Sequence, residues 1–244
     1  MHGAFCGAWV WEEHFLPYFA DNGFESHAVN LRGHDDNEQQ GFVHHIGLID
    51  YVEDLNEAVA HLDAPPILIG HSMGGIVVQK WLKENDAAGV VLMGSGPPHG
   101  MLPSSVGMMW RDPFLVSQLA LAQVFGPGVT LADNARKALF SDNLPSNVVN
   151  SHFSRGSAES MRVGFELIWP DLPVPEWNRE IPIFVLGAEN DFFVTPVMVR
   201  ATANIYKTEA LIIPDMAHAM MLEPNWHIAA EHIMAWLEDG VASS

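Results

Sequence analysis

Cysteine and positive charge are both scarce in this sequence. Cys6 is the only cysteine among 244 residues, which excludes a framework of intrachain disulfides. Lys and Arg number 11 against 30 Asp and Glu, giving a formal net charge of −19. Because nucleic acids and anionic membrane surfaces repel so acidic a chain, we expect neither as a partner.

Long apolar runs are missing as well. No stretch reaches the roughly 20 apolar residues of a membrane-spanning helix, and no signal-peptide pattern is present. Hydrophobic residues still make up 48% of the chain, enough for a substantial core. These features predict a folded cytoplasmic protein, and they leave its oligomeric state open.

Short apolar segments alternate with helical patterns along most of the chain, which is typical of a parallel sheet covered by helices on both faces. The predicted strands are 24–31, 65–70, 87–94, 181–187 and 209–214. The predicted helices of this alternating part are 7–23, 47–63, 74–85, 195–206 and 224–239.

Residues 97–178 interrupt this alternation. They carry 5 basic and 7 acidic side chains, a net charge of −2, whereas the remainder carries 6 and 23, a net charge of −17. We therefore predict an α/β core of residues 1–96 and 179–244 and a helical cap of residues 97–178. The helices expected in the cap are approximately 112–124, 131–141, 145–154 and 157–168.

The segment "IGHSMGG" (69–75) fits G-x-S-x-G at Gly70, Ser72 and Gly74. It joins a predicted buried strand to a predicted helix, the setting of a nucleophile elbow. Small residues allow the sharp turn, and the helix N-terminus favours developing negative charge. The alternative is a serine that only caps a helix, which does not account for the buried strand that runs directly into the turn. Ser72 is the predicted nucleophile, and His71 is expected to pack in the same turn.

A serine hydroxyl needs a base, usually a histidine that a carboxylate orients. His218 and Asp191 each follow a predicted strand, and the chain order Ser72, Asp191, His218 is that of hydrolases with this elbow. Glu189 is the second choice for the acid, and Asp215 is a weaker one.

The segments "HGAFCGAW", "LRGHDD", "GHSMGG", "GAENDFFVTP" and "AHAMMLEP" together resemble the α/β-hydrolase superfamily over essentially the whole chain. They are most similar to its small esterase and hydroxynitrile-lyase branch. The resemblance implies that the main-chain N–H groups of Ala4 and Met73 form an oxyanion hole. It also implies a cap inserted after the sixth strand. In the family a strand precedes the His-Gly loop, so N-terminal strands are expected to be missing here.

Aromatic and methionine side chains of the cap and of the loops around the elbow could line an adaptable apolar pocket. The predicted substrate-binding residues are Phe5, Met108, Trp110, Phe153, Trp169 and Met220.

These residues predict a serine hydrolase that cleaves a carboxylic ester of a small, largely apolar molecule through an acyl-enzyme, with no metal and no cofactor. A hydroxynitrile lyase is an alternative. That branch usually has a threonine after the loop histidine and a lysine after the catalytic histidine, where this chain has Gly3 and Ala219. A cofactor-free haloperoxidase, an acyltransferase and a non-catalytic ligand receptor use the same fold and stay open.

Overall fold

The computed structural model describes residues 1–34, 43–125, 132–168 and 180–241. Within them, four parallel strands form one sheet in the order β1-β2-β3-β4. The register pairs Leu68 with Val90, Val91 with Phe184, and Leu186 with Leu211. The strands are β1 (Ile67–His71), β2 (Gly89–Met93), β3 (Ile183–Ala188) and β4 (Ala210–Ile213).

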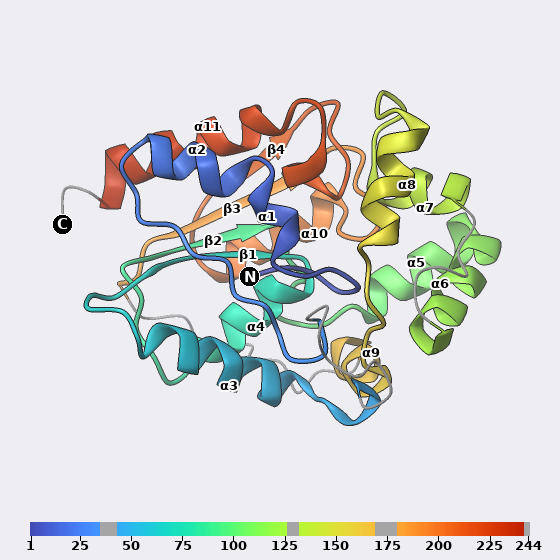
Figure 1. Ribbon diagram of the computed structural model, residues 1–244, viewed down its shortest axis with the longest axis horizontal. Coiled ribbons are helices and arrows are strands. Elements are labelled where there is room, and N and C mark those ends of the chain that lie inside the picture. The colour runs from blue at the N-terminus through green and yellow to red at the C-terminus, as the bar shows by residue number, and fades with distance from the viewer. Residues whose placement is uncertain (35–42, 126–131, 169–179, 242–244) are drawn as a thin grey trace.

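Helices cover both faces of this sheet, as Figure 1 shows. One apolar cluster joins three helices to one face: α3 (Leu48–Val59), α4 (Met73–Trp81) and α10 (Pro196–Ile205). A second cluster joins three others to the opposite face: α1 (Trp9–Glu12), α2 (Phe15–Asp21) and α11 (Trp226–Trp236). Short helical turns occur at η1 (Val43–His45), η3 (Met220–Leu222) and η4 (Leu237–Val241). The apolar strands are therefore buried from both sides, as the sequence predicted.

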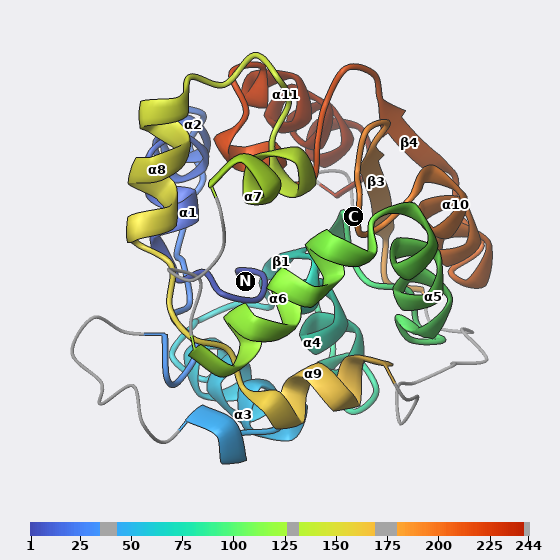
Figure 2. The same cartoon turned by 90° about the vertical axis from the view of Figure 1, so that its right-hand side faces the viewer.

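Within its described residues, the segment between β2 and β3 contains helices and no strand. Its helices gather beyond the end toward which the strands point, and Figure 2 views them from that end, with α6 crossing in front of the sheet. They are α5 (Leu102–Arg111), α6 (Pro113–Phe125), α7 (Ala132–Leu139), α8 (Ser146–Ser154) and α9 (Met161–Ile168). Helix α5 was not predicted, and α9 begins four residues later than the predicted helix 157–168. The division into core and cap stays a prediction.

The predicted strand at 24–31 is wrong, because this segment joins no ladder. Its polar groups instead bond to the first loop. The Leu31 N–H donates to His2 Nε2 at 3.2 Å, and the Asn30 side chain accepts from the Ala8 N–H at 2.8 Å. Met1 lies beside β1, donating from its main-chain nitrogen to the Ile69 carbonyl.

A buried polar network ties the segment between β2 and β3 to the rest of the molecule. His34 contacts Ser157 Oγ at 2.6 Å through Nδ1 and Glu159 Oε2 at 3.3 Å through Nε2. The Tyr51 hydroxyl donates to Glu159 Oε1 at 2.7 Å, and its pKa is raised by burial and by that carboxylate. This network holds the segment over the end of the sheet.

Candidate active site

Ser72 lies at a strained turn between β1 and α4. Its φ of +52° is in the left-handed region, which costs a non-glycine residue about 1–3 kcal/mol. A Cβ on Gly70 would lie 2.6 Å from the Gly75 Cα, and a Cβ on Gly74 would lie 2.3 Å from the His2 carbonyl oxygen. The spacing G-x-S-x-G is therefore a steric requirement of this turn, in which backbones approach too closely for side chains.

We expect Gly74→Ala to disturb both the fold and the site, because the new methyl would push the first loop away from the elbow. The overpacking should lower the free energy of unfolding by about 1–3 kcal/mol. Gly107 is the matched control: it lies inside α5 with nothing within 4 Å of a new Cβ. Gly107→Ala should be neutral or stabilising by up to about 1 kcal/mol. Denaturant melts of both variants test this, and equal effects would contradict it.

Asp191 and His218 form a buried pair at the carboxyl ends of β3 and β4. His218 Nδ1 lies 2.7 Å from Asp191 Oδ2, and the two residues are 4% and 3% exposed. The other carboxylate oxygen accepts the main-chain N–H groups of Phe193 and Val194, both at 2.8 Å. The Asp191 carboxylate is thus fixed by its own loop, and because it accepts from Nδ1–H, it favours the tautomer of His218 in which Nε2 carries no proton.

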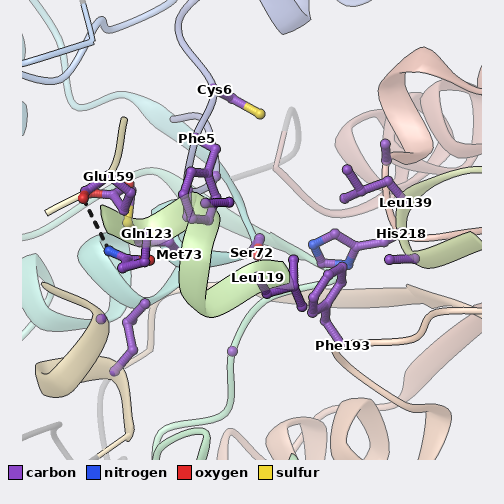
Figure 3. A pocket seen from close by; sticks show the side chains of 18 of the residues that line it. Phe5, Cys6, Ser72, Met73, Leu119, Gln123, Leu139, Glu159, Phe193 and His218 are labelled. Carbon is purple, nitrogen blue, oxygen red and sulfur yellow. Dashed lines mark hydrogen bonds between the residues drawn. The ribbon is translucent and has the colours of Figure 1, made fainter. Parts of the chain in front are cut away.

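Ser72 and His218 line the same part of one cavity, as Figure 3 shows. The structure therefore brings together the three residues that the sequence analysis selected. The rival acids lie elsewhere: Glu189 Oε2 accepts the main-chain N–H of the exposed Asp215 at 3.2 Å, and within the described residues neither carboxylate bonds to His218.

His71 has a positioning role that its place before Ser72 did not reveal. Its Nε2–H donates to the main-chain oxygen of His218 at 2.9 Å, and the two rings lie 4.7 Å apart. Burial, and then the nearby His218, lower the pKa of His71 well below its ordinary value. A neutral His71 therefore joins the turn at Ser72 to the loop of His218 without adding a charge.

The main-chain N–H groups of Ala4 and Met73 have no acceptor among the described residues, and both residues line the cavity. Met73 opens α4, so its N–H points out of the helix N-terminus. Gly3 brings the first loop close: a Cβ there would lie 3.0 Å from the Ser72 Cβ. These two donors fit the predicted oxyanion hole.

The cavity has a volume of about 710 Å³, within the range of small-molecule sites. Its wall combines the first loop, the elbow and helices of the segment between β2 and β3. Apolar side chains of this wall include Ile76, Met101, Val116, Leu119, Leu139, Phe140, Phe165 and Met221.

Three of the predicted substrate-binding residues, Phe5, Met108 and Phe153, lie in this wall. Trp110 does not line this cavity, and its side chain is 85% exposed. Met220 does not line the cavity either: it is fully buried beside Gly94, whereas its neighbour Met221 lines the cavity. Trp169 lies outside the described residues.

Cys6 lines the cavity but is a poor nucleophile. Burial, and then the nearby Glu159, raise the pKa of its thiol to about 12. At mildly alkaline pH we expect a thiol-specific disulfide reagent to label the folded protein about 100-fold or more slowly than the protein in denaturant, where the pKa returns to about 8.5. Spectrophotometric labelling measures both rates, and similar rates would contradict the assignment.

Among the described residues, no group of three or more His, Cys, Asp and Glu side chains is placed to hold a metal ion. Within the same residues, no helix has both the length and the apolar character needed to span a membrane.

Comparison with known proteins places this geometry in context. The profile of a family described as "Alpha/beta hydrolase family" matches residues 1–230. A search of curated proteins found no match.

Solved structures match at low sequence identity. An esterase from Exiguobacterium antarcticum superposes with a TM-score of 0.79 at 14% identity, covering 98% of this chain and 90% of that one. A bromoperoxidase from Bacillus anthracis gives 0.74 at 17%, with coverage of 98% and 90%. A pyrethroid hydrolase from Sphingobium faniae JZ-2 gives 0.64 at 15%, with coverage of 99% and 96%. At these identities the likeness concerns the fold.

Proposed function

Because the chain belongs to the alpha/beta hydrolase family, we propose that it is a serine hydrolase that cleaves a carboxylic ester of a small, largely apolar substrate. The observation that carries the proposal is the 2.7 Å bond between His218 Nδ1 and Asp191 Oδ2, beside Ser72 in an apolar cavity. This arrangement supplies a nucleophile, a base and an oriented acid in one buried place.

In the proposed reaction Ser72 Oγ attacks the ester carbonyl while His218 Nε2 takes the hydroxyl proton. The negative oxygen of the tetrahedral intermediate accepts hydrogen bonds from the Ala4 and Met73 N–H groups. His218 then gives its proton to the leaving alcohol, and the acyl group stays on Ser72. Water, deprotonated by the same histidine, attacks the acyl-enzyme, and the histidine then gives that proton to Ser72 Oγ as the carboxylic acid leaves.

The wall of the cavity supports an uncharged, apolar substrate. Apolar side chains, with methionine, leucine and aromatic residues prominent among them, make up most of this wall. A charged substrate would lose its hydration on entering such a cavity, at a large cost in free energy. The methionines of the wall adapt to irregular shapes, which is suited to a bulky acyl or alcohol group.

Hydrolysis of p-nitrophenyl esters of increasing acyl length tests the proposal. We expect turnover that rises with acyl length until the cavity is filled, and little turnover of esters with a charged acyl group. Cleavage of aromatic cyanohydrins is measured in parallel. Cyanohydrin cleavage without ester hydrolysis would replace the proposal with a lyase.

A further inference from the structure

One wall of the cavity carries a histidine that the proposed mechanism does not use. His152, on α8, lines the cavity and is 8% exposed. Its ring stacks on Trp9 at 6.0 Å and 16°, and on Phe140 at 5.8 Å and 25°. Two aromatic neighbours thus fix the plane of the imidazole, so that its edge is presented in one orientation.

The nitrogens of this imidazole are unused. Within the described residues neither makes a hydrogen bond to the protein, and neither is completely covered by surrounding atoms. Hydrogen bonds to protein groups engage His71, Ser105, the Nε2 of Gln123 and the Oε1 of Glu159, whereas within the described residues the Oε1 of Gln123 accepts none. Within the described residues, His152 is therefore available to a ligand, together with Ser72, His218 and the Gln123 amide oxygen, and it is the imidazole of this wall whose two nitrogens both lack a protein partner.

The surroundings define what this imidazole can bind. Burial lowers the pKa of His152, with Glu13 opposing the shift, so that the ring is neutral at physiological pH. A neutral imidazole offers one N–H donor and one acceptor nitrogen. A hydroxyl group matches either nitrogen, because it both donates and accepts. A charged group does not match, because the apolar wall would leave its charge without solvation.

We propose that His152 is a specificity-determining residue that hydrogen-bonds an uncharged hydroxyl group carried by the apolar body of the substrate, away from the scissile carbonyl. This inference rests on the proposed function and narrows its substrate class to hydroxylated apolar esters. An ester that lacks the hydroxyl leaves the buried imidazole without a hydrogen-bond partner, which lowers the affinity for that ester. The imidazole thereby discriminates between hydroxylated esters and esters without a hydroxyl.

A hydroxyl scan tests the proposal. Apolar esters are compared with analogues that carry one hydroxyl at successive carbons, first on the acyl side and then on the alcohol side. The readout is the ratio of kcat/KM between each hydroxylated ester and its parent. For at least one position we expect a ratio of about 10 in the unsubstituted protein, the worth of one hydrogen bond. His152→Phe keeps the aromatic stack and should bring that ratio to about 1.

Two further variants separate recognition from folding. His152→Asn retains a donor and an acceptor and should restore part of the ratio, whereas His61→Phe, on the exposed surface, should leave it unchanged. A ratio near one at every position in the unsubstituted protein, or the same ratio in His152→Phe, would overturn the proposal.

Binding distinguishes this inference from the proposed function. Calorimetry with Ser72→Ala measures the affinity for the same ester pairs without turnover. Preference for the hydroxylated member that His152→Phe removes supports the subsite, even if no ester is hydrolysed. Equal affinity for both members rejects it, even if hydrolysis is fast.

Discussion

Replacing Ser72 with alanine is expected to lower kcat for ester hydrolysis by about 10⁴-fold or more, because the acyl group then has no oxygen to bind. The remaining rate would come from the oxyanion donors and from substrate positioning. Thermal melting should show a stability close to that of the unsubstituted protein, because the strain at φ +52° comes from the Cβ, which alanine keeps. Stopped-assay kinetics with a p-nitrophenyl ester measures the loss.

The separate effects of Ser72→Ala on kcat and on KM also test the assignment. If Ser72 acts only as nucleophile, KM should change little while kcat falls, and a burst of p-nitrophenol should disappear. Retention of more than about one tenth of kcat would remove Ser72 from the mechanism. The absence of a burst in the unsubstituted protein would instead mean that acylation limits the rate.

Asp191→Asn is expected to lower kcat by about 10⁴-fold, nearly as much as removal of the nucleophile. The carboxylate accepts the proton of His218 Nδ1, whereas an amide can donate toward that nitrogen and so favour the other tautomer. His218 Nε2 would then carry a proton and could no longer act as a base. Because Asn keeps an oxygen for the Phe193 and Val194 N–H groups, the loop should stay in place.

Glu189→Gln and Asp215→Asn are the matched controls for this result. Each substitution removes a carboxylate that is close in sequence to Asp191 or His218, and within the described residues neither side chain bonds to His218. We expect each to keep kcat within about 3-fold, the range of surface substitutions. A large loss in Glu189→Gln together with an active Asp191→Asn would reassign the acid.

The elbow could be predicted from the sequence because its requirements are local. The Gly70–Gly75 and Gly74–His2 approaches leave no space for a Cβ, so that the pattern itself records the geometry. Asp191 and His218 followed from a topological rule: loops after parallel strands meet at one edge of the sheet. Both arguments need only short segments and their order.

The lining of the cavity could not be predicted in the same way. Helix α6 is apolar on several sides, and Phe114 and Leu121 on it are 59% and 50% exposed, so that hydrophobicity does not tell which face points inward. The same ambiguity holds for α5, where Met108 lines the cavity and Trp110, two residues later, is 85% exposed. His152 gave no signal either, because only the stack with Trp9 and Phe140 distinguishes it from a surface histidine.

The separation of the site residues along the chain has a consequence for folding. The bond between His71 and His218 joins residues 147 positions apart, and Ala4, the proposed oxyanion donor, comes from yet another region. Closing such long loops costs entropy before any contact is gained, so these pairings form late. Helix α3 and the strand–turn–helix around Ser72 can form from local contacts, but no partly folded chain that lacks β4 can hold the base. In refolding experiments esterase activity should therefore return after the helical circular dichroism signal. The recovery of activity would then measure how fast the sheet is completed.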